Sequence, residues 1–378
     1  MSFSWKKAAA AAVGLGLVLS PLAACSSGTS GGTSTTAGGG GGSGALIGVF
    51  MPTKTLPRWN RDGADLQKLL EADGYKVSLQ YADNKNDQQI SQIENVINGG
   101  AKVLVIASID GTTLTPTLAK AAAKGIKVIA YDRLILNTPN VDYYATFDNE
   151  KVGTLQGQFI ETQLGLKDGK GPFNFEAFAG SPDDNNAKFF FKGAYDVLKP
   201  YVDSGKLVSV SGKWPTSLDG WKSIGILGWG SDTAQSEMEN RLNSFYTGGK
   251  KVQVVLSPND SLALGISKAL QNAGYKAGAD YPVLTGQDAD LANTVNILGG
   301  LQSMTVWKDT RKLGVQAAKM VKQIVDGTTV DVNNTADYNN GVKTVPSYLL
   351  DPQVVTKDTV QSALVDSGFW TKKDLGLS

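Results

Sequence analysis

The stretch Lys127-Val128-Ile129-Ala130-Tyr131-Asp132-Arg133 decides the fold class. Its four apolar residues, 128–131, predict a buried strand of a parallel sheet. The carboxylate of Asp132 and the guanidinium of Arg133 follow where this strand should end, and ligands of open α/β sheets bind beyond the carboxyl ends of strands. Such a pair of acceptor and donor suits a ligand with many hydroxyl groups. A structural ion pair that caps the sheet is an equally good interpretation of this stretch alone.

The same arrangement recurs on both sides of this stretch. Apolar strand patterns alternate with amphipathic helix patterns, which predicts two α/β halves, each with a doubly wound parallel sheet covered by helices on both faces. Each half has about a hundred residues or more, the usual size of a domain. The predicted strands are 46–51, 76–81, 103–107, 127–131, 173–178, 207–210, 252–256, 282–285 and 303–307, and the clearest helices are 65–70, 90–97, 112–124, 233–246, 262–273 and 310–325.

The composition excludes several classes of function. The chain has 378 residues, a formal net charge of +1 and no histidine. The near-zero charge argues against nucleic acid as a partner, because such proteins present a basic face. The lack of histidine excludes Ser-His-Asp and Cys-His catalysis and histidine-based zinc sites. Enzymes that use only carboxylates, lysine or tyrosine remain possible.

The first 44 residues have the pattern of an export signal and a tether. Lys6 and Lys7 precede a short apolar run, and Leu22-Ala23-Ala24-Cys25 resembles the lipobox of bacterial lipoproteins. We therefore expect a signal peptide at 1–24, a lipid anchor on Cys25, and a flexible Ser/Thr/Gly tether at 25–44. An ordinary secretory signal that happens to contain a cysteine is the alternative.

Polar and aromatic side chains gather at the predicted strand ends. Carboxylates, amides and cations are mixed there with tryptophans, whereas phosphate sites are mostly cationic and rich in glycine. An aromatic face packs on the C–H face of a sugar ring, and hydrogen bonds from charged groups to the hydroxyls are worth about 1.5–3 kcal/mol each. Taken singly, each residue is explained better as a helix cap, a solvated charge or a core residue than as a ligand contact. The candidate sugar-binding residues are Arg58, Trp59, Asp132, Arg133, Asp184, Asn186, Trp229, Asn259, Asp288 and Lys308.

Several motifs in the chain resemble one known family. From about Ala45 onward the chain is similar to the type I periplasmic binding proteins of bacterial ABC transporters, and most similar to their xylose-binding and multiple-monosaccharide-binding branch. The motifs that carry the resemblance are the stretches 51–59, 104–113, 130–133, 145–149, 180–187, 257–260, 286–290 and 345–350.

The resemblance implies that these candidate residues contact a monosaccharide. Trp229 is placed least firmly among them, because Trp214 and Trp221 lie nearby in the sequence. The residue at the position of Asn259 varies within this branch, so the preferred sugar stays open among xylose, glucose, galactose and arabinose types. The resemblance also implies a three-strand hinge, which we place near residues 147–148, 308–309 and 339–340. The N-terminal lobe would then be 45–147 plus 309–339, and the C-terminal lobe 148–308 plus 340–378.

The resemblance also implies the partners. We expect a monomeric, lipid-anchored receptor on the outer face of the cytoplasmic membrane, which delivers sugar to an ABC permease and needs no catalytic residue, metal or cofactor. The ATPase would be a separate chain, because no Walker-type loop is present.

Two alternatives stay open. The chain could be a sensor that presents sugar to a membrane receptor, or a carboxylate-only glycosidase or isomerase using Asp132, Asp184 or Asp288. A transcription regulator of the same fold would need a helix-turn-helix before Leu46, where the signal and the tether stand instead.

Overall fold

The computed structural model describes residues 44–278 and 280–378. The predicted signal peptide, the predicted tether up to residue 43 and Cys25 with its predicted lipid anchor lie outside these residues. None of the helices in the described part of the chain has the length and apolar character needed to cross a membrane.

The first sheet has six parallel strands in the order β11-β5-β4-β3-β1-β2. Helices α1 and α9 share a core with one face of this sheet, and α2 and α3 share another core with the opposite face. The strands are β1 (Leu46–Met51), β2 (Lys76–Tyr81), β3 (Val103–Ile106), β4 (Lys127–Tyr131), β5 (Tyr143–Phe147) and β11 (Ser347–Leu350), and the helices are α1 (Pro57–Ala72), α2 (Asn86–Asn98), α3 (Thr115–Ala123) and α9 (Thr310–Val325). We call this sheet with its helices the first lobe.

The second sheet has four parallel strands in the order β7-β6-β8-β9. An antiparallel pair, β10 with β12, joins it through a bridge between Gln287 and Val306. The strands are β6 (Phe173–Ala177), β7 (Leu207–Ser209), β8 (Val254–Leu256), β9 (Val283–Leu284), β10 (Met304–Trp307) and β12 (Gln353–Thr356), and the helices are α4 (Asn149–Leu164), α5 (Asn185–Asp203), α6 (Ser231–Phe245), α7 (Asp260–Asn272) and α8 (Leu291–Gly299). We call this part the second lobe. Short helical turns lie at η1 (Leu218–Ile224), η2 (Leu227–Trp229) and η3 (Gln361–Val365).

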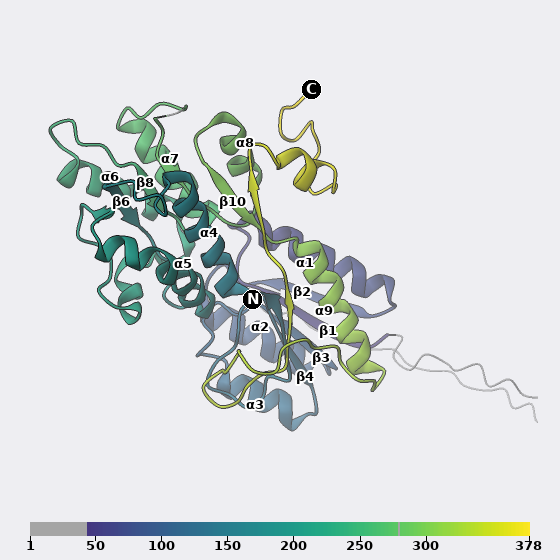
Figure 1. Ribbon diagram of the computed structural model, residues 1–378. Coiled ribbons are helices and arrows are strands. Elements are labelled where there is room, and N and C mark those ends of the chain that lie inside the picture. The colour runs from purple at the N-terminus through teal and green to yellow at the C-terminus, as the bar shows by residue number, and fades with distance from the viewer. Residues whose placement is uncertain (1–43, 279) are drawn as a thin grey trace, which may run out of the picture. The chain divides into compact units, whose positions relative to one another are not determined.

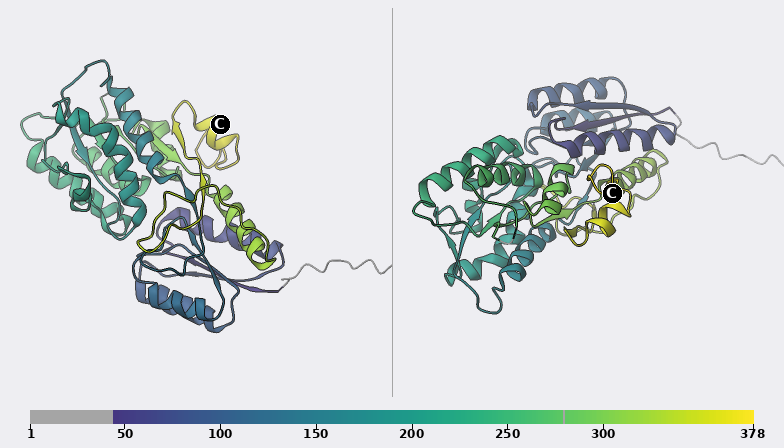
Figure 2. Two further views of the ribbon diagram at one scale, coloured as in Figure 1. Left: turned by 60° about the horizontal axis from the view of Figure 1, so that its bottom comes forward. Right: turned by 90° about the horizontal axis from the view of Figure 1, so that it is seen from above.

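The two lobes are discontinuous in the sequence, as the colours of Figures 1 and 2 show. The chain leaves the first sheet after β5 and enters α4, which packs on α5 of the second lobe. It returns after β10 into α9, which packs on α1. The alternation of strand and helix patterns therefore predicted the α/β class and the two parallel sheets correctly.

The predicted position of the third crossing, near residues 339–340, is wrong. Beyond it, β11 pairs in parallel with β5 of the first sheet, from Ser347 opposite Tyr144 to Leu350 opposite Phe147. Residues 340–350 therefore belong with the first lobe, and the chain crosses to the second lobe between β11 and β12. The sequence pattern could not show this, because the choice of partner for a four-residue strand depends on backbone hydrogen bonds to a segment 200 residues away.

Some elements begin earlier than predicted or were not predicted. Helix α1 begins at Pro57, where proline is well suited to the first helical position, so Arg58 and Trp59 lie in its first turn and not in the preceding loop. Strand β5 and helix α8 had no prediction, although the motif at 145–149 overlaps β5.

Candidate functional site

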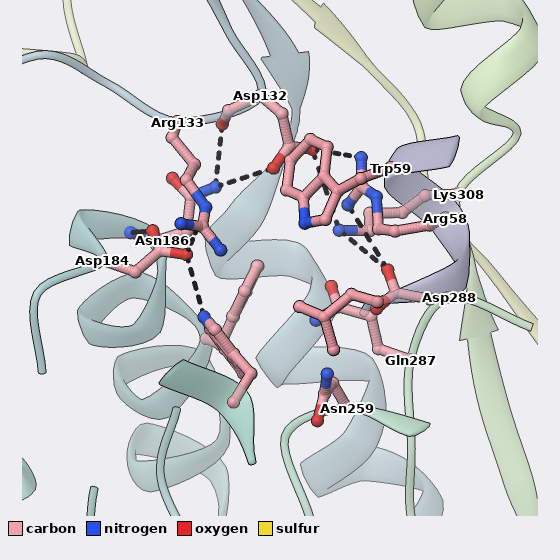
Figure 3. A pocket seen from close by; sticks show the side chains of 13 residues that line it. Arg58, Trp59, Asp132, Arg133, Asp184, Asn186, Asn259, Gln287, Asp288 and Lys308 are labelled. Atoms are coloured by element: carbon pink, nitrogen blue, oxygen red, sulfur yellow. Dashed lines mark hydrogen bonds and ion pairs between the residues drawn. The ribbon is translucent and has the colours of Figure 1, made fainter. Parts of the chain in front are cut away.

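All ten candidate residues line one cavity between the two lobes (Figure 3). The lining includes three residues that were not among the candidates: Leu56, Phe190 and Gln287.

The first lobe contributes residues from the carboxyl ends of β1 and β4. Arg58 and Trp59 come from the first turn of α1, which follows β1, and Asp132 and Arg133 directly follow β4. The carbonyl of Asp132 accepts hydrogen bonds from Tyr144 Oη at 2.6 Å and Thr146 Oγ1 at 3.0 Å. Both donors lie in β5, so this neighbouring strand holds the backbone of Asp132 at the cavity.

The second lobe contributes residues from helix starts and strand ends. Asp184 and Asn259 are N-caps: Oδ1 of Asp184 accepts from the Asn186 N–H at 2.9 Å, and Oδ1 of Asn259 accepts from the Leu262 N–H at 3.0 Å. Asp288 lies in the turn after β9, and Lys308 follows β10. Asp184 and Asn259 therefore both cap a helix and line the cavity, because these helices begin at the edge of the sheet.

A network of five charged side chains occupies one side of the cavity. Its members are Arg58, Asp62, Asp132, Asp288 and Lys308, and we call it the cavity network. Arg58 is its centre: Nη2 lies 2.8 Å from Asp62 Oδ2 and 2.9 Å from Asp132 Oδ2, and Nη1 lies 3.5 Å from Asp288 Oδ1. Lys308 Nζ lies 3.2 Å from Asp288 Oδ1 and 4.0 Å from Asp132 Oδ2. The pair of Arg58 with Asp288 joins the two lobes.

A second set of polar contacts joins the lobes on the other side of the cavity. Arg133 Nε lies 2.9 Å from Asp184 Oδ2, which also accepts a hydrogen bond from Trp229 Nε1 at 3.2 Å. The amide of Asn186 donates to the Asp132 carbonyl at 2.8 Å and to its carboxylate at 3.4 Å. Asp132 is therefore held from both lobes at once.

Burial and neighbouring charges act in opposite directions on these carboxyl groups. Burial raises the pKa of Asp132, but the positive charges of Arg58, Lys308 and Arg133 outweigh it and leave the pKa below its usual value. At Asp184 burial prevails over the charge of Arg133, and the pKa is raised. Asp132 is thus an ionised acceptor, suited to hydrogen bonds from hydroxyl groups.

Of the three tryptophans considered for stacking, Trp229 lines the cavity. Trp214 instead stacks on Tyr195 with ring centroids 5.1 Å apart, and Trp221 is buried in the core of the second lobe. Trp229 lies directly on Gly180, where a Cβ atom would come within 2.1 Å of its ring. Trp59 contacts the two guanidinium groups of the cavity, with Arg58 Cζ 4.3 Å and Arg133 Cζ 5.2 Å from the centre of its ring.

Three lining residues have left-handed backbone conformations although none is glycine. The φ angles are 60° at Asp132, 56° at Trp229 and 100° at Asp288. Each such residue costs about 1–3 kcal/mol, and this kind of strain is concentrated at functional sites. The surrounding hydrogen bonds therefore hold these side chains in place at the expense of stability.

Several buried polar atoms at the cavity lack a hydrogen-bond partner within the described residues. They include the donors Arg58 Nε and Trp59 Nε1 and the acceptor Gln287 Oε1. Buried polar atoms are usually paired, so these atoms are available to a polar ligand. The sequence could have indicated two of the three lining residues that were not predicted. Gln287 is next to Asp288, and Phe190 lies one helical turn after Asn186 on α5. Leu56 had no signal beyond its place next to α1.

The described residues contain no cluster of three or more His, Cys, Asp or Glu side chains arranged to hold a metal ion. The cavity carboxylates are instead interleaved with arginine and lysine.

Comparisons with known proteins identify the family. The family model of the periplasmic binding protein domain matches residues 47–329. The chain belongs to the periplasmic binding protein family. This assignment confirms the type I fold and the family that the sequence motifs indicated.

Several characterised members of the periplasmic binding protein family are similar over most of their length. The multiple sugar-binding periplasmic receptor ChvE of Rhizobium radiobacter is 48% identical over 97% of this chain and 98% of its own. The D-xylose-binding periplasmic protein of Escherichia coli K12 is 38% identical over 87% of this chain and 92% of its own. A solved ABC transporter solute-binding protein of Clostridium phytofermentans with bound β-D-glucose is 51% identical, with a TM-score of 0.83 over 87% of this chain and 99% of its own. The relatives are binding proteins and not enzymes.

Proposed function

We propose that this protein captures one monosaccharide in the cavity and delivers it to an ABC permease. The observation that carries the proposal is the charge balance of the lining. Its three cations, Arg58, Arg133 and Lys308, are matched by three carboxylates, those of Asp132, Asp184 and Asp288. A lining of this kind offers many strong donors and acceptors but no net charge, which suits a neutral polyhydroxy ligand better than an anion.

The ten predicted residues would have distinct roles toward the sugar. We infer that the carboxylates and Asn259 accept hydrogen bonds from its hydroxyls, and that the cations donate to its oxygens. Trp59 or Trp229 would pack on the apolar face of the ring. The relatives that bind xylose, glucose or several sugars support a pentose or aldohexose, of the xylose, glucose, galactose or arabinose type.

Release and delivery would depend on motion of the two lobes. We infer a hinge at the three crossings, near residues 147–148, 308–309 and 350–353, around which the cavity opens and closes. The protein would act outside the cytoplasm as a monomer, anchored through a lipid on Cys25, with its ATPase supplied by another chain.

The cavity is suited to binding rather than catalysis. Each of its carboxylates lies within 4 Å of a cation, and the pKa of Asp132 is lowered, so this group is a poor general acid. Burial raises the pKa of Asp184, but its Oδ2 is held by Arg133 Nε and Trp229 Nε1, which suits a fixed hydrogen-bond acceptor. We therefore infer that the sugar is returned unchanged.

The test is isothermal titration calorimetry of the purified protein, first stripped of sugar by mild denaturation and refolding. D-xylose, D-glucose, D-galactose and L-arabinose would be titrated in turn, and the sugar would afterwards be recovered and analysed by NMR. We expect saturable binding of at least one sugar with micromolar affinity or better, and recovery of the same sugar. No heat from any monosaccharide would overturn the proposal, and a converted sugar would favour the carboxylate-only enzyme.

A further inference from the structure

The segment after β12 packs against the second lobe close to the cavity. Its residues Val360, Leu364 and Phe369 share a buried cluster with Ala289 and Trp307, which lie beside the cavity residues Asp288 and Lys308. Figure 1 shows this C-terminal segment in yellow, beside α8. The segment is thus anchored to the part of the second lobe that holds the turn 286–290.

One side chain of this segment holds the backbone of the turn directly. Trp370 Nε1 donates a hydrogen bond of 2.9 Å to the carbonyl of Ala289. Asp288 and Ala289 both have left-handed backbone conformations, with φ angles of 100° and 53°. A strained turn persists only where its surroundings hold it, and the Trp370 bond adds to the bonds from the Asp288 and Ala289 N–H groups to Val306 and Thr305.

The same aromatic residues also hold the first lobe. The guanidinium of Arg61 contacts both rings, with Cζ 4.1 Å from the ring centre of Phe369 and 4.6 Å from that of Trp370. Arg311 of α9 lies 5.2 Å from the Phe369 ring and donates from Nη1 to the Ser367 carbonyl at 3.0 Å. The C-terminal segment therefore contacts both lobes outside the cavity.

Arg61 lies one helical turn after Arg58 on α1. The helix and the turn 286–290 consequently meet twice: inside the cavity through Arg58 and Asp288, and outside it through Arg61 and the aromatic pair. Cation–π contacts of this kind are stronger when they are desolvated, and burial at this contact lowers the pKa of Arg61.

We propose that Phe369 and Trp370 form a clasp that positions Asp288 for the ligand and holds the lobes together around it. The clasp rests on the proposed sugar binding. It slows ligand release, because its contacts with Arg61 must break before α1 and the turn 286–290 separate. Phe369, Trp370 and Arg61 are positioning residues, since none of them lines the cavity.

The test compares four variants of the whole protein with D-glucose and D-xylose as probes. Trp370→Phe removes the bond to Ala289 but keeps an aromatic ring, Arg61→Ala removes the cation, and Arg61→Lys restores a positive charge. Lys373→Ala removes an exposed charge from the same segment and is the matched control. Affinity would be measured by calorimetry and the dissociation rate by stopped-flow fluorescence.

We expect Trp370→Phe and Arg61→Ala to dissociate about 5- to 10-fold faster at nearly unchanged association rate, since most changes in affinity within one complex are changes in dissociation rate. Arg61→Lys should recover part of the loss, and Lys373→Ala should match the unmodified protein. Unchanged dissociation rates in both clasp variants would overturn the clasp. A lower melting temperature of both variants with an unchanged dissociation rate would also overturn it, because the residues would then only stabilise the fold. If the unmodified protein binds neither probe nor any other monosaccharide, the proposed function fails instead, which is a separate outcome.

Discussion

Two networks of buried charges in this protein have similar chemistry and different surroundings. The cavity network, centred on Arg58, lies between the lobes. The other network lies in the core of the second lobe and consists of Glu176, Ser211, Glu237, Arg241 and Tyr246, and we call it the core network. Glu176 and Arg241 are both almost completely buried, with 0% and 2% of the residue exposed.

The core network satisfies its charged groups internally. The carboxylate of Glu176 accepts bonds from Tyr246 Oη at 2.8 Å, from Ser211 Oγ at 2.6 Å and from Arg241 Nη1 at 3.0 Å. Arg241 also bonds Glu237 and the Ala177 carbonyl, both at 2.8 Å. In the cavity network, by contrast, Arg58 Nε and Asp62 Oδ1 have no partner among the described residues. Both networks are therefore buried charge, and the unpaired atoms of the cavity network are what distinguishes it from the core network.

The largest expected effect is the loss of stability when the core network is broken. Arg241→Met leaves Glu176 without its cation, and removing one partner of a buried pair costs about 3–5 kcal/mol of stability. The free energy of unfolding, measured with urea, should fall by this amount, while sugar affinity of the folded fraction changes little. The double variant Arg241→Met with Glu176→Gln should recover much of the loss. A stable single variant that binds sugar poorly would contradict the separation of the two networks.

The next largest effect is the loss of sugar affinity when the cavity network is broken. Asp132→Asn removes the ionised acceptor and leaves Arg58 less well paired, and the loss of such a buried charged contact costs about 3 kcal/mol, or roughly 100-fold in affinity. Calorimetry with the preferred sugar would measure it. The matched control is Asp73→Asn, an exposed residue at the far end of α1 from the cavity. If both variants bind the sugar equally well, Asp132 does not contact it.

A smaller loss of affinity is expected when the tryptophan that lines the cavity is replaced by another aromatic residue. Trp229→Phe keeps an aromatic face but loses the hydrogen bond from Nε1 to Asp184, so we expect a loss of about 1 kcal/mol, or roughly 5-fold in affinity. Trp214→Phe is the control, because this ring stacks on Tyr195 away from the cavity. The two dissociation constants, measured by calorimetry, should differ. A larger loss with Trp214→Phe would reassign the stacking residue.

The smallest effect concerns the buried carboxyl groups of Asp260 and Asp290. At Asp290 burial outweighs the nearby charges of Arg61 and Arg58. Burial, together with the charge of Asp288, raises the pKa of Asp290 to about 7, and burial raises the pKa of Asp260 well above its usual value. Between about pH 4 and 7 the folded state keeps a proton that the unfolded chain has lost, so this group makes stability fall as pH rises. Asp290→Asn should therefore raise the melting temperature more at pH 8 than at pH 5, by about 2–4 °C. Differential scanning calorimetry at both pH values would show it, and an equal shift at both would contradict the raised pKa.

Much of the candidate site could be predicted from the sequence. Polar residues directly after the strands of a parallel sheet, such as Asp132 after β4, must lie at one edge of that sheet, because all its carboxyl ends point the same way. All ten candidates consequently line one cavity. Phe190 and Leu56 were missed because apolar residues near a helix start look the same whether they face a core or a ligand.

The sequence by itself determined the α/β class, the two sheets and the composition of the cavity, since hydrophobic periodicity and strand-end chemistry are local properties of the chain. Only the tertiary structure decided which charged groups pair, which tryptophan faces the cavity, and that β11 lies in the first sheet. It also decided that Trp370 bonds Ala289, 81 residues away. Such contacts depend on how distant segments pack against one another, and no local pattern of residues specifies that.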